Sequence, residues 1–367
     1  MEATERCRRA RLVPEDLRTN NFDFLRVLLA ISVVWSHSFG LYFGTEENEP
    51  ISILLNGVYN TGNIAVRAFF CISGFLITAS YLRNNSLYSY FCKRILRIYP
   101  GYIVCVMICS FIVIPAFSTS VTLDLTQVMR TIAASFFLDD EFPQSNAFES
   151  HPLTAINGSL WSISYEFWCY IGIAVLGVFK LLERRQLVSL IAVAFTMSGV
   201  FLDVYDLNPG LGIIGDIIGW PYLWTSVAPC FLSGSLIYLY KEKLPRDART
   251  LVFLVTCAVV SSQFSSILTH AIFPYCLAYL VFYFSYSKLK MPDAKYGDFS
   301  YGTYLYGFPI QQMLLTAGLP FVVYVPTAMS LSLIAGVLSW WVIERHFLRR
   351  PKRKPIDKVD IAPFVAE

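Results

Sequence analysis

Charged residues are scarce in this sequence, and their scarcity excludes an ordinary soluble domain. Aspartate, glutamate, lysine and arginine make up 15% of the 367 residues, whereas about a quarter is usual in soluble globular proteins. Hydrophobic residues make up 55% of the chain, which is more apolar surface than a soluble core can bury. The composition therefore predicts an all-α polytopic membrane protein.

The sequence also lacks the cysteine and histidine spacings that build metal sites and disulfide frameworks. Its nine cysteines include no CxxC pair, lie mostly inside apolar runs and have no histidine at ligand spacing. We interpret them as small core residues and expect no metal site. The formal charge of +3 is small and the basic residues are scattered, so nucleic acid is not expected as a partner.

The sequence contains many long apolar runs. A membrane-spanning helix needs about 20 predominantly apolar residues. Such runs occur at 22–43, 62–82, 99–117, 162–182, 187–205, 220–240, 250–268, 270–287, 299–318 and 321–345. We therefore expect about ten transmembrane helices in a membrane domain at 21–347. A flexible or surface-lying arm at 1–20 precedes this domain, and a basic tail at 348–367 follows it.

Lysine and arginine mark alternate loops between these runs. They gather in the N-terminal arm, the C-terminal tail and the loops at 83–97, 180–185, 241–249 and 288–295. The intervening loops have Arg130 as their only basic residue. Because cytoplasmic loops carry the excess of lysine and arginine, both termini are expected in the cytoplasm. The longest connection, 118–161, then lies outside, and its stretch 125–138 is expected to form a helix at the membrane interface.

The first apolar run contains three polar residues that need an explanation, Asp23, Arg26 and His37. Arg26 and His37 are eleven positions apart, which places them on the same helix face, about 16 Å apart along the axis. Ionisable residues inside a membrane generally mark a site or a pathway. The alternative is that the side chain of Arg26 extends so that its charged group lies at the membrane–water interface, and that His37 is a hydrogen-bonded packing residue.

The expected topology brings Arg67 and Glu166 to the outer level of the membrane, where His37 also lies. Buried charges are costly unless paired, so we expect Arg67 and Glu166 to pair with each other or with His37. A histidine beside a carboxylate is the usual general base for a hydroxyl group, and a nearby arginine stabilises an anion. We therefore predict a catalytic site of His37, Glu166 and Arg67. The alternative is a static network that ties three helices together.

A second polar group is expected at the cytoplasmic face, in the segment KRILRIYP. Its Arg94 and Arg97 lie one helical turn apart, and arginine binds phosphate through paired hydrogen bonds. They are candidates for a phosphate site that Arg26 would join. The alternative is that these basic residues and the interfacial Tyr99 only anchor the topology. Glu344 reaches the same face and is expected to pair with one of the arginines.

Six segments of the chain occur in the order found in one protein family. They are FDFLRVLLAISVVWSH (22–37), RAFFCISGFLIT (67–78), KRILRIYP (93–100), GSLWSISYEFWCY (158–170), DFSYGTYLYGFPIQQ (298–312) and WVIER (341–345). Through these segments the sequence resembles the integral membrane acyltransferase family 3. Its members acylate sugars of O-antigens, capsules, exopolysaccharides and lipochitooligosaccharides.

The resemblance implies a membrane-bound O-acyltransferase in the bacterial inner membrane, surrounded by membrane lipids. It implies a cytoplasmic acyl-coenzyme A donor, usually acetyl-CoA, and a carbohydrate acceptor on the outer side. It implies that His37 accepts a proton or carries the acyl group. It also implies that Arg26, Arg94 and Arg97, with Tyr99 beside them, face the phosphates of coenzyme A.

The same segments supply candidate substrate-binding residues. The tryptophan-serine-glutamate block of the family matches Trp161 and Ser162, ahead of Glu166. The serine-tyrosine-glycine block matches Ser300 and Tyr301. The resemblance therefore predicts that these four aromatic and hydroxyl residues contact the substrates.

The chain departs from the family pattern at two positions. Gly307 stands where many members have histidine, and His346 stands where many have proline at the end of the last helix. The polar residues inside the membrane also fit a transporter or flippase for a glycan or an anion, although the internal symmetry common in transporters is absent. A purely structural membrane scaffold would leave the polar cluster without a use.

Overall fold

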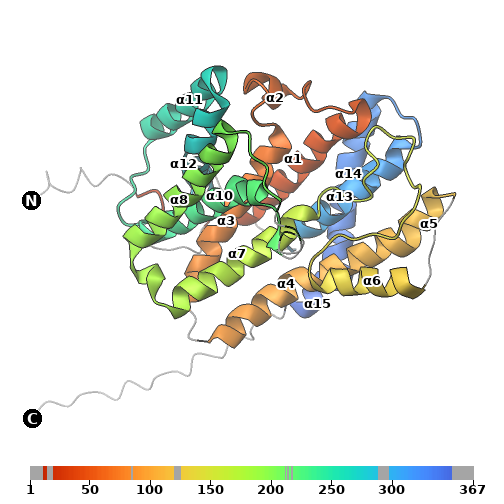
Figure 1. The fold of residues 1–367 in the computed structure, drawn as a ribbon, viewed down its shortest axis with the longest axis horizontal. Helices are drawn as coiled ribbons and strands as arrows, with labels where there is room; N and C mark the ends of the chain where they lie inside the picture. The colour runs from red at the N-terminus through yellow and green to blue at the C-terminus, as the bar shows by residue number, and fades with distance from the viewer. Residues whose placement is uncertain are drawn as a thin grey trace, which may run out of the picture.

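A computed structural model describes residues 11–14, 20–83, 86–119, 125–210, 212, 215, 218–287 and 297–348. The described residues form helices joined by loops, and their only β-pairing is an isolated bridge between Arg11 and Pro245. Figure 1 shows the helices packed side by side in one bundle. The basic loop expected at 288–295, most of the N-terminal arm and nearly all of the tail lie outside the described residues.

The helices are listed here in chain order. They are α1 (Phe22–Phe43), α2 (Pro50–Leu54), α3 (Thr61–Leu82), α4 (Leu87–Ile108), η1 (Cys109–Val113), α5 (Ile114–Phe117), α6 (Leu125–Phe136), α7 (Trp161–Val178), η2 (Leu181–Glu183), α8 (Arg185–Val204), α10 (Pro221–Leu239), α11 (Ala248–Phe264), α12 (Ser266–Ser285), α13 (Ser300–Leu315), α14 (Phe321–Ser339), η3 (Trp340–Glu344) and α15 (Arg345–Phe347).

Eight helical segments of the described chain are long and apolar enough to cross a membrane. They start at Phe22, Thr61, Leu87, Trp161, Arg185, Pro221, Ser266 and Phe321. The remaining two expected ranges are also helical, but α11 is shorter than a full span and α13 has 16 residues. The chain is thus an all-helical, multi-pass integral membrane protein, and a helix occupies each of the ten expected ranges.

Helix α4 begins earlier than the sequence pattern predicts. The run of basic residues was expected in a loop, whereas α4 starts at Leu87, directly after a cap in which Ser86 Oγ accepts a hydrogen bond from Ser89 N (3.3 Å). A serine at this position favours helix initiation because it satisfies a free backbone N–H. Arg94 and Arg97 therefore project from a helix. Their charge lowers the hydropathy of this segment, which conceals the helix in the sequence.

The helix expected within 125–138 is confirmed as α6. It lies beside α4 (Figure 1), and the Tyr99 hydroxyl of α4 donates a hydrogen bond to the Phe136 carbonyl at the end of α6 (3.0 Å). α6 therefore packs against the bundle.

The N-terminal arm is not a free surface segment in its described part. Leu12 and Val13 are fully buried, and Leu12 N donates a hydrogen bond to the Leu244 carbonyl (2.8 Å) in the loop between α10 and α11. Two apolar side chains in an otherwise polar arm give it a place to pack. The expectation of a flexible arm is wrong for these residues.

Helices α3 and α10 cross at two glycines. A Cβ atom at Gly74 would lie 1.8 Å from the Phe231 carbonyl oxygen, and one at Gly234 would lie 1.9 Å from the Cys71 carbonyl oxygen. Ser235 Oγ donates a hydrogen bond to the Gly74 carbonyl (3.2 Å) across the same contact. Small residues let membrane helices approach this closely. The crossing joins two helices that supply walls of the cavity described below.

Helix α1 lies between α3 and the pair α13 and α14 (Figure 1). Gln311 Nε2 on α13 donates hydrogen bonds to the Val34 carbonyl and to Ser38 Oγ, both at 2.8 Å. One turn earlier, a Cβ atom at Gly307 would lie 2.7 Å from Val34 Cγ2. Because α1 occupies this space, the absence of a side chain at Gly307 allows α1 to pack closely against α13.

Candidate active site

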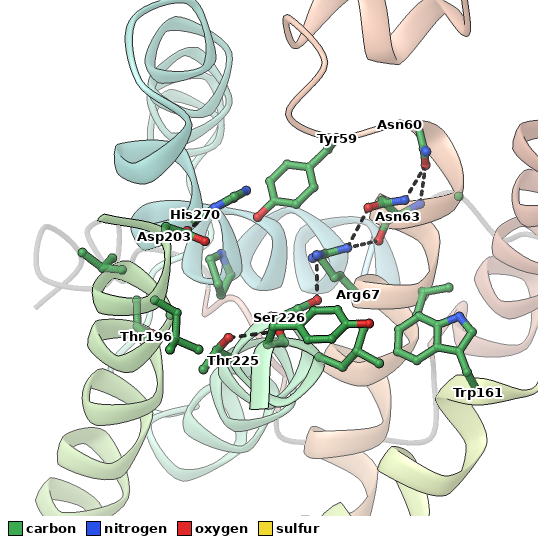
Figure 2. Close-up of a pocket in the computed structure, with 18 of the residues that line it drawn as sticks. Tyr59, Asn60, Asn63, Arg67, Trp161, Thr196, Asp203, Thr225, Ser226 and His270 are labelled. Atoms are coloured by element: carbon green, nitrogen blue, oxygen red, sulfur yellow. Dashed lines mark hydrogen bonds and ion pairs between the residues drawn. The ribbon is translucent and has the colours of Figure 1, made fainter. Parts of the chain in front are cut away.

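Two cavities lie toward opposite ends of α1. The first, the His37 cavity, has a volume of about 380 Å³ and is lined by the second half of α1, the start of α3 and parts of α8, α10 and α12 (Figure 2). The second, the arginine cavity, has a volume of about 470 Å³ and is lined by Arg26 near the start of α1, by α3, α4 and α7, and by the start of α13. α1 therefore connects the two cavities.

The His37 side chain faces the first cavity with an unused hydrogen-bonding atom. Its Nδ1 is buried and has no hydrogen-bond partner among the described residues. The ring packs edge-on against Phe308, with 5.3 Å between the ring centroids. Buried polar atoms without a partner are rare and call for a ligand, a water molecule or a catalytic role. The geometry thus disfavours the alternative of a hydrogen-bonded packing residue, since Nδ1 has no partner among the described residues and the residue lines a cavity.

Arg67 lies in the same cavity, one helix away. Its guanidinium donates hydrogen bonds to the Asn63 carbonyl (3.2 Å), to Asn63 Oδ1 (3.3 Å) and to Ser226 Oγ (2.7 Å), as Figure 2 shows. It also lies over the ring of Tyr59, 4.6 Å from the ring centroid. These partners are all neutral, so the positive charge of Arg67 stays in the cavity.

Two acids neutralise two of the arginines at the second cavity. Arg97 forms ion pairs with Asp298 (2.5 Å) and Glu344 (3.3 Å), and Arg26 also reaches Asp298 (3.5 Å). Burial favours the neutral form of Asp298, but Arg97 and Arg26 outweigh this effect and hold its pKa below the usual range. The predicted pairing of Glu344 with an arginine is confirmed, and the expected grouping of Arg26 with Arg97 occurs through Asp298.

A π-helical turn brings Glu344 into this ion-pair network. The last long helix widens at η3, and Glu344, at the end of that turn, is 2% exposed. Its Oε1 accepts a hydrogen bond from Ser339 Oγ (2.9 Å). The helix then continues through His346 to Phe347 as α15. A histidine in place of proline therefore leaves the helix unbroken at this point.

Arg94 differs from its neighbours because it has no acidic partner among the described residues. Its Nη2 donates a hydrogen bond to Ser80 Oγ (3.3 Å), and its Nε is buried without a hydrogen-bond partner among the described residues. The rings of Tyr90 and Tyr170 lie 5.9 Å and 6.0 Å from the guanidinium carbon. Arg94 is thus a fixed cation in the arginine cavity with an unused donor.

Glu166 lies between hydroxyl groups in the arginine cavity. Its Oε1 accepts hydrogen bonds from the Tyr170 hydroxyl (2.6 Å) and from Ser73 Oγ. These bonds connect α7 to α3 and fix the carboxylate in the wall of the cavity that Arg94 also lines.

A sequence profile described as "Acyltransferase domain" matches residues 19–345. This chain belongs to the acyltransferase 3 family. An "O-acetyl transferase" of Shigella phage Sf6 is 28% identical over 345 residues, which span 92% of this chain and 98% of the relative. "Nodulation protein 10" of Rhizobium leguminosarum bv. viciae is 27% identical over 323 residues, 82% of this chain and 84% of the relative. No solved structure matches the sequence.

The predicted site residues of this acyltransferase divide between the two cavities. His37, Arg67 and Trp161 line the His37 cavity. The arginine cavity is lined by Arg26, Arg94, Arg97, Ser162, Glu166, Ser300 and Tyr301. The structure thus brings together most of the predicted residues, but in two groups.

The expected pairing of Glu166 with Arg67 or His37 is wrong. Glu166 accepts hydrogen bonds from Ser73 and Tyr170, whereas Arg67 bonds to Asn63 and Ser226. Ser73 is six positions beyond Arg67 on α3, which is about 9 Å further along the helix axis. The expected topology and the residue count from the helix starts placed Glu166 too close to the His37 end of the acyltransferase.

Tyr99, predicted at the donor site, lies elsewhere in the acyltransferase. It is not among the residues that line the arginine cavity. Its hydroxyl bonds to the Phe136 carbonyl, and its ring packs edge-on against Phe167, with 5.6 Å between centroids. Tyr99 therefore connects α4 to α6 and α7.

The two cavities of the acyltransferase approach each other at one level of the bundle. Val66 on α3 lines both of them, and at the start of α7 Trp161 lines one while Ser162 lines the other. Ser162 Oγ donates a hydrogen bond to the Tyr304 hydroxyl (2.7 Å), which donates in turn to the Ser159 carbonyl (2.7 Å). A thin layer of side chains therefore separates the cation-lined space from the histidine.

Several site residues of this acyltransferase escape sequence reasoning. Asp298 stands just before an apolar run, where an acid normally remains in solvent, yet it lies against two arginines. Ser73 and Tyr304 are neutral residues inside apolar runs and give no signal by charge or spacing. The only sequence signal for Asp298 and Tyr304 is that both lie within the DFSYGTYLYGFPIQQ segment.

Proposed function

We propose that this acyltransferase transfers an acetyl group from acetyl-CoA to a hydroxyl group of a cell-surface or exported carbohydrate. One observation carries the proposal. The arginine cavity and the His37 cavity lie toward opposite ends of α1, and Val66 lines both of them. The first is lined by cations, and the second by a histidine whose Nδ1 has no hydrogen-bond partner among the described residues. The relative named "O-acetyl transferase", aligned over nearly its whole length, supports the choice of acetyl group and hydroxyl acceptor.

The arginine cavity suits the donor in charge and in shape. Arg94 and Lys93 lie at its basic end, where the phosphates of coenzyme A would bind. Apolar side chains, among them Phe69 and Ile77, line the remaining wall and would contact the pantetheine arm. Arg26 and His37 are about 16 Å apart along α1, on the order of the length of an extended pantetheine arm. The thioester would then reach the layer next to His37 while the nucleotide stays at the basic end.

His37 would act as the general base in the transfer. The oxygen of the acceptor hydroxyl forms a bond to the thioester carbonyl carbon as its proton moves to the imidazole of His37. The carbon–sulfur bond then breaks, and the thiolate of coenzyme A takes a proton from the imidazolium. The products are an ester and free coenzyme A, and the imidazole is neutral again. Glu166, which bonds to Ser73 and Tyr170, would position the donor beside Arg94.

The orientation of the protein follows from the positive-inside rule. We infer that the arginine cavity faces the cytoplasm, where acetyl-CoA is made, and that the His37 cavity faces the outside of a bacterial inner membrane. The alternation of basic loops along the sequence supports ten crossings with both termini in the cytoplasm. The acceptor would then be acetylated on the outer side.

Arg94 and Arg97 are expected to respond differently to substitution by glutamine. Because Arg94 has no acidic partner, Arg94→Gln should raise the KM for acetyl-CoA by about tenfold or more, the effect of losing hydrogen bonds to a charged group, with little change in kcat. Arg97→Gln leaves Glu344 buried without a cation and should lower the stability by about 3 kcal/mol. Steady-state kinetics and thermal unfolding in detergent measure the two effects.

The double variant Arg97→Gln/Glu344→Gln is the control for this contrast. It removes the unpaired acid, while Asp298 keeps Arg26 as its partner, so part of the lost stability should return. Equal effects of Arg94→Gln and Arg97→Gln on both KM and stability would contradict the assignment of separate roles.

The function is tested with the purified protein, radiolabelled acetyl-CoA and surface glycan from a candidate host. The proposal predicts label in alkali-labile ester linkage on the glycan. Uptake of glycan or anion into vesicles without transfer of label would instead support a transporter.

A further inference from the structure

The His37 cavity contains a cation that no acid of the described residues neutralises. Arg67 is bonded to Asn63 and Ser226 and lies over the ring of Tyr59, and none of these groups carries a negative charge. No carboxylate of the described residues lies within 4.0 Å of its guanidinium, the distance that defines the ion pairs of this structure. The charge is therefore compensated by dipoles only.

The two acids that line this cavity are already engaged. Asp203 Oδ2 lies 2.6 Å from Nδ1 of His270 (Figure 2). Glu46 accepts a hydrogen bond from Asn60 Nδ2, and burial together with the nearby Glu49 raises the pKa of Glu46. Neither acid pairs with Arg67, and the negative charge of Glu46 is disfavoured. The cavity thus keeps an uncompensated positive centre at Arg67.

The surroundings hold this centre in a fixed position. The guanidinium donates three hydrogen bonds to two neutral partners and lies over the face of an aromatic ring, which fixes it between α3 and α10, the helices in close contact at Gly74 and Gly234. An unpaired cation inside a membrane protein is costly. Holding such a cation in place is typical of a preorganised binding site whose counter-charge comes with the ligand.

We propose that Arg67 binds an anionic group of the acceptor, so that the preferred acceptors are acidic carbohydrates. The anion is a carboxylate, as in a uronic acid, or a phosphate, since the guanidinium fork fits both. Trp161 and Tyr222 also line this cavity and offer apolar ring surfaces to a sugar. This inference rests on the proposed function, because it names the acceptor class for the same site.

Binding to matched pairs of glycans tests the proposal without any acyl donor. The protein is placed in lipid nanodiscs and titrated with hexagalacturonate and its methyl ester, and with a phosphorylated pentamannoside and its dephosphorylated form. Free glucuronate and inorganic phosphate serve as minimal probes. In each pair the sugar chain is the same, and the second member lacks the negative charge because its carboxylates are esterified or its phosphate is removed. Wild type is expected to bind the charged member of at least one pair tenfold or more tightly than the neutral member, and the preferred pair distinguishes carboxylate from phosphate.

Variants assign the preference to Arg67. Arg67→Gln should reduce the ratio of the two affinities to about one, and Arg67→Lys should keep part of it, because lysine retains the charge without the fork. Arg130→Gln is the matched control, since Arg130 is an exposed arginine on α6 that pairs with Glu141, and it should leave the ratio unchanged.

The proposal is overturned by any of three results: wild type binds no anionic probe, it binds charged and neutral glycans equally, or the preference survives in Arg67→Gln. These results are distinct from failure of the proposed function. Absence of acetyl transfer alongside an Arg67-dependent anion preference would refute the enzyme assignment and leave the anion site standing.

Discussion

Replacement of His37 by alanine is expected to lower the rate of acetyl transfer by about 10²–10⁴-fold, the contribution typical of a positioned general base. His37 Nδ1 is buried without a partner, and the ring lines the cavity that lies next to the arginine cavity. No other described histidine shares this setting, because His151 bonds to Gln312 and His270 to Asp203. The measurement is the initial rate of ester formation with saturating acetyl-CoA.

The control for this variant is His346→Ala. His346 is exposed at the end of the last helix and lines neither cavity, so its replacement should leave the rate unchanged. Both variants should elute from gel filtration as wild type does. Full activity of correctly folded His37→Ala protein would exclude His37 as the base.

Replacement of Gly74 by alanine is expected to prevent assembly of the native bundle. The new Cβ would lie 1.8 Å from the Phe231 carbonyl oxygen, and a backbone atom cannot move aside as a side chain can. α3 and α10 would have to separate, which should cost at least about 3 kcal/mol, at the upper end of overpacking effects. The measurement is the fraction of monodisperse protein recovered in mild detergent, together with its thermal unfolding.

Gly172→Ala is the matched control for Gly74→Ala. A Cβ at Gly172 on α7 meets no atom within 4 Å, so this variant should fold and unfold as wild type does, or be slightly more stable because alanine favours the helix. Normal recovery and stability of Gly74→Ala would show that α3 and α10 do not cross as closely as described.

Hydropathy predicts the helices of this protein well, because a membrane span must be both long and apolar. It fails where helical residues carry charge. The start of α4 contains Lys93, Arg94 and Arg97, which line a cavity and still belong to the helix. Hydropathy places such a segment in a loop, whereas the Ser86 cap marks where the helix begins.

The candidate site was predictable only in part, because the sequence does not fix how deep in the membrane residues of different helices lie relative to one another. Arg26 and His37 lie on one helix, so their relation follows from the geometry of an α-helix. Glu166 and Arg67 lie on different helices, and their relative depth depends on where α7 begins and how α3 and α10 cross. The sequence does not encode these features in any single segment. Consequently Glu166 lies at the arginine cavity and not beside His37.

Partners for the charges were harder to predict than the charges themselves. Glu344 was expected at the arginines because it is an acid in an apolar run, where an acid needs a cation. Asp298 lies just outside the apolar run, so the run gave no reason to expect its ion pairs with Arg26 and Arg97. Arg67 was expected to pair with Glu166 or His37, but its hydrogen-bond partners among the described residues are all neutral. Neutral hydrogen-bonding residues such as Asn63 and Ser226 resemble many others in the sequence, so they give no advance signal.

Transfer across the bilayer is tested most directly in sealed vesicles. The protein is reconstituted in either orientation, and labelled acetyl-CoA and glycan acceptor, both unable to cross the membrane, are supplied on chosen sides. Labelled ester should form when donor and acceptor are on opposite sides of the membrane. None should form when both are outside, because each protein molecule then exposes only one of its two cavities to the substrates. Equal ester formation with both substrates on the same side would contradict a donor cavity and an acceptor cavity at opposite ends of α1.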